Sequence, residues 1–228
     1  NFIKSILIFM DLLSTVEDLK ENGYVKINEF MSFDECILLE KKAIKAFKKA
    51  KEDLYHTNND YVKVLSISEK NANEYRYLKF LTKFFTDENL KSFVKSYFMT
   101  DDIEISKIFL AESSNNGEIV DKLPYKMHFD KTRYLKLMVY LRDVNSEDGG
   151  ITFAKKEWNT KLQEELLNKQ ALQEENVVEV NDPEAIDEIK GQRGTAVFFD
   201  TNITHKAGQV TSENKRLVLR IDTRIKIN

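Results

Sequence analysis

The sequence predicts an α+β protein with a mainly β core and helices ahead of it. Helical spacing of apolar residues dominates the chain up to residue 102, whereas β-branched residues, alternation and turn signals dominate from residue 103. No internal repeat and no Pro/Gly-rich linker separates the two parts, and 228 residues suit one domain. We therefore expect a single domain over residues 1–228, with a mostly helical flank at 1–102 and a β core at 103–228.

The composition indicates a folded protein without a strong field of one charge. Hydrophobic residues make up 42% of the chain, and 35 basic residues nearly balance 38 acidic ones. This balance argues against nucleic acid or an anionic membrane as a partner. The one cysteine, Cys36, cannot form an internal disulfide, which fits a cytoplasmic location. The apolar segment at 2–10 is short for a membrane span, so we expect a packing arm there.

Two helices with clear end signals open the chain. Residues 11–22 place apolar side chains on one side of a helix, Gly23 suits a left-handed helix end, and a short strand at 24–27 follows. The Ser-x-x-Glu pattern at 32–35 predicts a capping box, in which each of the two side chains binds an orphan backbone N–H. Apolar spacing then extends the second helix to Leu54.

An aromatic-rich helical region is expected between Tyr75 and Tyr97. Its apolar residues recur at mixed spacings of three and four, which is typical of helix faces buried in a core. His56 lies ahead of this region among polar residues, and we interpret it as a surface histidine in a loop. These helices are expected to supply a wall for the β core and no site.

Short strands dominate the remainder of the chain, with one helical insert at about 155–174. Polar and glycine-containing runs at 113–117 and 145–150 are typical of the loops between strands. The expected strands lie at 103–110, 135–141, 151–153, 177–180, 195–199 and 215–225.

Two side chains that can bind a metal, His128 and Asp130, stand two positions apart. In a strand such positions point to the same face, so the imidazole and the carboxylate would converge. His205, one of only three histidines, is the obvious third donor, and two nitrogens with one carboxylate are typical of non-heme Fe(II) oxygenases. A zinc hydrolase is disfavoured, because no His-Glu-x-x-His is present. The competing interpretation is an ordinary strand-end histidine, since a His-x-Asp tripeptide also arises by chance.

A buried arginine is expected eleven residues after His205, where Arg216 opens a strand with strict alternation. An inward guanidinium is costly to bury unpaired and needs a carboxylate. A small-molecule diacid would supply one in bidentate geometry. One face of this strand carries Leu217, Leu219 and Ile221, and the other carries Arg216, Val218, Arg220 and Asp222.

Together these motifs resemble the 2-oxoglutarate-dependent Fe(II) dioxygenases, most closely the phytanoyl-CoA dioxygenase-like family. The resemblance rests on His128-Phe129-Asp130, the distal His205 and Arg216 eleven residues later. It covers nearly the whole chain in the same order. The further matching segments are 19–25, 30–32, 135–144 and the Gly-x-x-x-Phe-Phe-Asp strand at 194–200.

The resemblance implies a double-stranded β-helix, a jelly roll of the cupin-like kind, as the core at 103–228. It also implies that His128, Asp130 and His205 bind Fe(II) and that Arg216 binds the distal carboxylate of 2-oxoglutarate. Dioxygen would be the other cosubstrate. The chain departs from the family at 155–158, where many members have a Gly-Ser-His, and this changes the segment over the pocket.

Other positions of the motif strands are weaker candidates for ligand contacts. Tyr140 and Lys136 are further candidates for binding 2-oxoglutarate, and a structural role is an equally good interpretation of each. For substrate contacts, a strand-surface or salt-bridge role competes with the functional one. The candidates for those contacts are Arg133, Tyr134, Arg220 and Asp222.

The predicted activity is hydroxylation of a C–H bond of a small polar metabolite, with release of succinate and CO2. Asp130 favours hydroxylation, because the halogenating relatives carry a small residue at that position. Two other functions stay open. One is a cupin-type isomerase or epimerase of a sugar derivative, which would not need Arg216 paired with a diacid, and the other is a non-catalytic metal-binding module on the same barrel.

Overall fold

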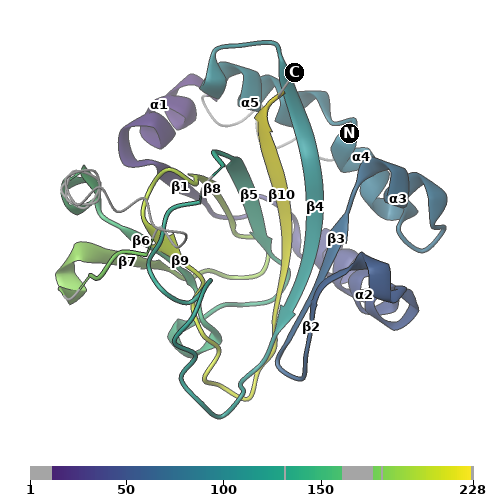
Figure 1. Cartoon of the computed structure of the whole chain (residues 1–228). Helices are drawn as coiled ribbons and strands as arrows, with labels where there is room; N and C mark the ends of the chain where they lie inside the picture. Colours follow the sequence, from purple (N-terminus) through teal and green to yellow (C-terminus); the bar gives the residue numbers. More distant parts are fainter. Residues whose placement is uncertain (1–11, 131, 161–176, 181, 227–228) are drawn as a thin grey trace.

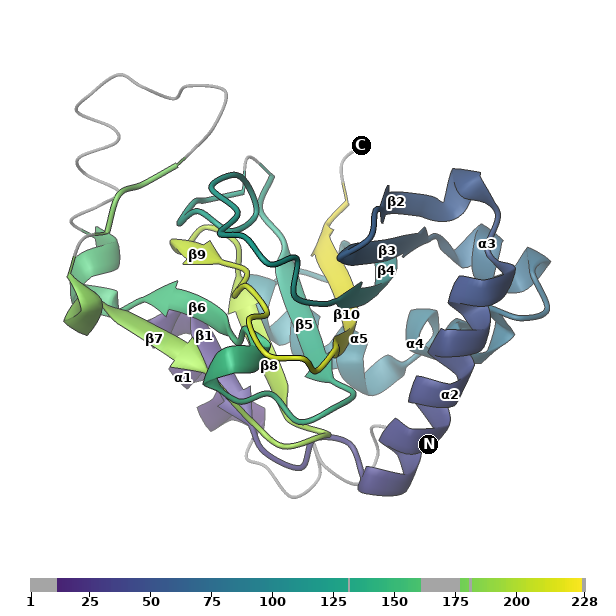
Figure 2. The ribbon, with the colours of Figure 1, turned by 90° about the horizontal axis from the view of Figure 1, so that it is seen from below.

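Two antiparallel sheets form the body of the protein in the computed structural model, which describes residues 12–130, 132–160, 177–180 and 182–226. Within these residues the larger sheet has seven strands in the order β1-β8-β5-β10-β4-β3-β2, and the smaller has three in the order β7-β6-β9. Neighbouring strands pair antiparallel in both sheets. Helices α2 to α5 lie along the outer side of the large sheet, and α1 lies beside β1 at one edge of it (Figures 1 and 2).

The helices are α1 (Leu12–Asn22), α2 (Phe33–Lys49), α3 (Glu69–Glu74), α4 (Thr82–Phe85) and α5 (Glu88–Phe98). The first five strands are β1 (Tyr24–Ile27), β2 (Tyr55–Asn58), β3 (Val62–Ile67), β4 (Ile103–Ser113) and β5 (Leu135–Tyr140). The remaining strands are β6 (Ile151–Ala154), β7 (Ile186–Ile189), β8 (Ala196–Asp200), β9 (His205–Lys206) and β10 (Arg216–Ile225). This is the jelly-roll architecture that the sequence predicted.

The two faces of the large sheet are buried against different partners. Leu217 and Leu219 of β10 are fully buried in the cluster that contains Phe93 of α5. On the other face, Phe199 of β8 packs against Phe153 of β6, with ring centroids 5.2 Å apart. The alternation predicted for β10 is therefore confirmed, and the space between the two sheets receives its polar face.

The N-terminal flank contributes strands as well as helices. The capping box is confirmed, since Glu35 N donates to Ser32 Oγ at 3.3 Å and Ser32 N donates to Glu35 Oε2 at 3.1 Å. The prediction that this helix continues to Leu54 is wrong, because the backbone is extended at Ala50, after α2 ends. Tyr55 then donates its hydroxyl proton to the carbonyl oxygen of Phe47 at 2.7 Å. The chain thus folds back on α2 and enters β2 and β3, which the sequence did not predict.

Three other predictions of local structure need correction. His56 is exposed as expected but lies on β2 instead of in a loop. Residues 177–180 do not form a strand, since Val177 makes only an isolated bridge to His128. The predicted helical region before Tyr97 is divided into α4 and α5. Of the helix predicted at 155–174, residues 156–160 are helical, and the remainder lies outside the described residues, as does the segment 2–10.

None of the described helices combines the length and the apolar character that a membrane crossing requires.

Gly194 is required at the turn that leads into β8. Its φ is +88°, and a methyl group on its Cα would overlap the carbonyl oxygen of Met31. Gly117 offers a matched control, because its φ of +77° is similar but nothing lies within 4 Å of the place a Cβ would take. We predict that Gly194→Ala lowers the free energy of unfolding by about 1–3 kcal/mol more than Gly117→Ala does, measured by urea denaturation. Equal losses of unfolding free energy in the two variants would show that the positive φ, and not the contact with Met31, determines the effect.

Candidate metal centre

His128 and His205 are brought together by the backbone. The N–H of His128 donates to the carbonyl oxygen of His205 at 2.9 Å, and the N–H of His205 donates back to His128 at 2.9 Å. Residues that exchange both bonds in this way lie directly opposite each other, and their side chains leave on the same side. The two imidazole centroids are 4.5 Å apart. His128 is extended but belongs to no named strand, so the prediction that a strand carries His128 and Asp130 was wrong in that respect.

Both imidazoles turn Nε2 toward the site. Nδ1 of His128 lies 2.8 Å from the carbonyl oxygen of Lys126, and Nδ1 of His205 lies 2.9 Å from that of Ile203. A carbonyl oxygen can only accept, so each Nδ1 carries a proton, and Nε2 is the nitrogen that the neutral form of each ring offers to a metal. Burial, with Lys136 and His128 close by, lowers the pKa of His205 to about 3. His205 is therefore neutral at pH 7.

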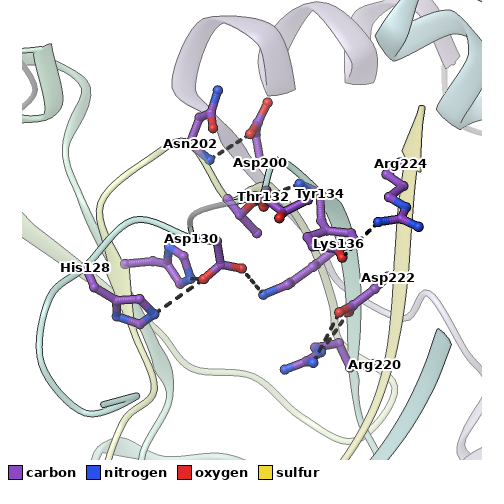
Figure 3. Close-up of polar contacts among 12 residues, drawn as sticks. His128, Asp130, Thr132, Tyr134, Lys136, Asp200, Asn202, Arg220, Asp222 and Arg224 are labelled. Atoms are coloured by element: carbon purple, nitrogen blue, oxygen red, sulfur yellow. Dashed lines mark hydrogen bonds and ion pairs between the residues drawn. The ribbon is translucent and has the colours of Figure 1, made fainter. Parts of the chain in front are cut away.

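Asp130 completes the group with one of its two oxygens. Its Oδ1 lies 3.5 Å from Nε2 of His128 and 3.6 Å from Nε2 of His205, whereas its Oδ2 contacts the ammonium of Lys136 (Figure 3). Burial opposes ionisation, but the contacts of Asp130 with His128, Lys136 and His205 together hold its pKa well below its usual range. The backbone N–H of Asp130 donates to the carbonyl oxygen of Thr201 at 3.1 Å. Asp130 is thus ionised, and it is held by its backbone N–H as well as by its side chain.

This donor set fits a divalent transition metal. The three ligand atoms of His128, Asp130 and His205 lie within 4.8 Å of one another. The two distances from Asp130 Oδ1 to the imidazole Nε2 atoms, 3.5 and 3.6 Å, are short enough for each pair to bind one ion at about 2.0–2.2 Å. Two imidazole nitrogens and one carboxylate oxygen on one side of a metal leave the other side open for ligands. In the part of the chain that the structure describes, no second group of three such side chains meets the same criterion.

Arg216 lies buried on the same side of the large sheet, 9% exposed. One of its terminal nitrogens donates to the carbonyl oxygen of Gly208 at 2.9 Å, and no carboxylate among the described residues forms an ion pair with it. Burial lowers the pKa of Arg216, while Tyr140, Tyr125 and Asp148 oppose that shift. Because a guanidinium has five N–H donors, this buried cation retains unused capacity to bind an anion.

Tyr140 and Lys136, the other candidates for 2-oxoglutarate contacts, already have partners. The Tyr140 hydroxyl donates to the carbonyl oxygen of Ile189 at 2.8 Å and accepts from the N–H of Ile151 at 3.1 Å. Its single proton is therefore engaged in joining β5 to the small sheet. The ammonium of Lys136 contacts Asp130 instead of lying beside Arg216. Within the described residues, neither side chain forms a hydrogen bond or an ion pair with Arg216.

Of the four candidates for substrate contacts, Arg133 is drawn toward a buried acid. Its Nε and Nη2 lie 2.7 and 2.6 Å from Oδ2 of Asp200, which also accepts the hydroxyl proton of Tyr97 at 2.6 Å. The guanidinium carbon lies 5.6 Å from the ring centroid of Phe98. This arrangement ties the segment after Asp130 to β8 and α5. The sequence analysis did not predict a role for Asp200. An acidic residue at the end of an apolar strand would have indicated a buried carboxylate that needs a cationic partner.

The other three candidates lie together near Lys136. Arg220 forms a two-pronged ion pair with Asp222, at 2.8 and 3.2 Å, and its guanidinium carbon lies 4.0 Å from the ring centroid of Phe109 (Figure 3). The ring of Tyr134 lies 6.0 Å from the Lys136 nitrogen. The ion pair with Asp222 uses two of the five N–H groups of Arg220. The other N–H groups of this fixed cation remain available to a ligand.

Arg133→Met is predicted to lower the free energy of unfolding by about 1–2 kcal/mol, because it removes a charged hydrogen-bond donor from the buried carboxylate of Asp200. Chemical denaturation measures the loss. Lys156→Met is the control, since Lys156 pairs with Glu21 at 3.0 Å while both side chains are more than half exposed. That change should cost less than about 0.5 kcal/mol. Similar losses in the two variants would refute the role assigned to Arg133.

The structure is similar to those of several solved enzymes. SnoN, described as an epimerase in complex with Fe3+, alpha ketoglutarate and nogalamycin RO, has 14% sequence identity and a TM-score of 0.65, over 93% of this chain and 82% of SnoN. The carbocyclase SnoK from nogalamycin biosynthesis has 14% identity and a TM-score of 0.65, over 92% and 82% of the two chains. At these identities the likeness shows the fold.

HygX from Streptomyces hygroscopicus, solved with nickel and 2-oxoglutarate bound, is similar over 92% of this chain and 85% of its own, with 11% identity and a TM-score of 0.58. No curated protein sequence matches this chain. The family model of phytanoyl-CoA dioxygenase (PhyH), however, matches residues 19–218. Because that match takes in most of the sequence, from the end of α1 into β10, the chain belongs to the phytanoyl-CoA dioxygenase family.

Proposed function

We propose that the protein is an Fe(II)- and 2-oxoglutarate-dependent oxygenase that hydroxylates a C–H bond of a small polar metabolite. The observation that carries this proposal is the convergence of two imidazole nitrogens and one oxygen of Asp130 on one point, beside a buried arginine without an acid partner among the described residues. SnoN and HygX, which share the fold, are described with 2-oxoglutarate and a metal bound.

In this proposal His128, Asp130 and His205 hold the iron, and Arg216 binds the distal carboxylate of 2-oxoglutarate. The bound iron and cosubstrate would supply the oxidising power, with O2 and 2-oxoglutarate consumed and succinate, CO2 and one hydroxyl group on the substrate formed. The protein supplies orientation. The two Nδ1 hydrogen bonds fix the imidazoles, and a buried guanidinium suits a carboxylate in a fork of two hydrogen bonds.

The substrate is proposed to be polar, because charged side chains line the wall beside Asp130. Arg220 is fixed by Asp222 and by the ring of Phe109, and it retains N–H donors. Such a cation is suited to a carboxylate or another oxygen acceptor of the substrate. We assign Tyr134 to the same wall and Arg133 to the support of Asp200.

Hydroxylation is favoured over halogenation because Asp130 supplies a carboxylate to the metal group. SnoN is an epimerase and SnoK a carbocyclase, so the outcome of the reaction is decided by product analysis. Hydroxylation adds one oxygen atom that derives from O2, which mass spectrometry with 18O2 detects. A cupin-type isomerase would form its product without consuming O2 or 2-oxoglutarate.

Anaerobic addition of Fe(II) and 2-oxoglutarate is predicted to give a visible charge-transfer band. His128→Ala should abolish it, because a metal ligand is lost. Arg216→Met should raise the Kd for 2-oxoglutarate by at least about tenfold while leaving metal binding intact, because a charge-assisted contact of about 1.5–3 kcal/mol is lost. Arg224→Met is the matched control, since Arg224 is on the same strand but binds Glu104 at 2.6 Å.

The control variant should bind the cosubstrate like the wild type. A wild-type protein that gives no band, and no succinate in air across a panel of amino acids and sugar acids, would refute the proposed function.

A further inference from the structure

Lys136 is a buried cation in the middle of the large sheet. It lies on β5 between β8 and β10, where its register partners are Phe199 and Asp222, and it is 8% exposed. Strands on both sides fix its backbone. Figure 3 shows its side chain extending toward Asp130, and Asp130 is the one described residue with which its ammonium forms an ion pair. Burying an ammonium is costly, so this contact sets the direction of the side chain.

Because of this contact, the two carboxylate oxygens of Asp130 have different partners. Oδ2 is taken by the ammonium of Lys136, and Oδ1 alone faces the Nε2 atoms of His128 and His205. A carboxylate free to turn can bind a metal through one oxygen or through both. Binding through both would occupy a position that a chelating ligand needs. The lysine therefore selects the one-oxygen arrangement.

The alternative role for Lys136, gripping the distal carboxylate of 2-oxoglutarate, does not fit its position. Arg216 lies at the start of β10, and the register partner of Lys136 on that strand is Asp222. Six residues of strand separate those positions, about 20 Å at the usual rise. Lys136 and Arg216 are thus rooted far apart along the sheet, and Lys136 approaches the metal group from the side of Asp130.

We propose that Lys136 is a positioning residue that holds Asp130 to the metal through Oδ1 alone and so keeps open the coordination position that a 2-oxo acid needs. This inference rests on the proposed function. It predicts that loss of the ammonium weakens the binding of any 2-oxo acid to the metal-loaded protein, whether or not that acid has a distal carboxylate.

The test compares two acids in two variants. 2-Oxoglutarate and pyruvate share the chelating 2-oxo acid head, but pyruvate has no distal carboxylate. In anaerobic Fe(II)-loaded protein, Lys136→Met should raise the Kd of both acids by a similar factor of at least about tenfold, the usual size of effects from groups that orient metal ligands. Arg216→Met should raise the Kd of 2-oxoglutarate only. Lys136→Arg, which keeps a cationic donor to Oδ2, should restore the binding of both.

A second readout needs no 2-oxo acid. The absorption of Co(II)-loaded protein reports the coordination of the metal, and it should change in Lys136→Met but not in Arg216→Met. Thermal unfolding and retained Co(II) binding establish that each variant is folded. If Lys136→Met does not fold, Lys136→Arg carries the test, because a selective loss of 2-oxoglutarate binding in that variant would also contradict the proposal.

Two results overturn the inference. In the first, Lys136→Met weakens the binding of 2-oxoglutarate but not of pyruvate, which would mean that Lys136 binds the distal carboxylate. In the second, it changes neither acid nor the Co(II) spectrum. Failure of the proposed function gives a different pattern, in which the wild type itself forms no complex with either acid.

Discussion

The exchange of two backbone hydrogen bonds between His128 and His205 is the interaction on which the rest of the site depends. It joins the segment ahead of β5 to β9, and through β9 to β6 of the small sheet. Each imidazole is then turned by a carbonyl oxygen two residues before it, at Lys126 and at Ile203. The orientation of both rings thus comes from the main chain, which substitutions of neighbouring side chains disturb little.

Two pairs of opposite charges lie beside the metal group. Lys136 balances Asp130, and Arg220 balances Asp222. Arg216 differs from Lys136 and Arg220, since no described acid forms an ion pair with it. A buried charge without a partner is expensive, so the fold keeps Arg216 at a cost that a bound anion would offset. This asymmetry separates the two ends of the site, with a balanced wall near Asp130 and a cation at the other end.

Features set by local sequence were predictable, and those set by tertiary pairing were not. The capping box at Ser32 and the alternation along β10 depend on neighbouring residues alone. β7 and β9 have four and two residues, too few for alternation to stand out, and they exist because β6 offers an edge to each. The convergence of His128 with His205 was inferred from residue types and motif order. The course of the Lys136 side chain was not, because two neighbouring strands and a loop determine it.

The residues that hold Asp130 are also separate from the wall formed by Arg220 and Phe109. The segment after Asp130 is attached to the end of β8, where Thr201 accepts the N–H of Asp130 through its carbonyl and that of Tyr134 through its hydroxyl, at 3.1 and 2.8 Å. Arg220 and Phe109 stand on β10 and β4 and contribute nothing to these bonds.

In the proposed function, substitutions of Arg220 and Phe109 would change the surface that a substrate meets without breaking the hydrogen bonds that hold Asp130. An epimerase, SnoN, and a carbocyclase, SnoK, both share this fold, so one jelly roll can carry different reactions.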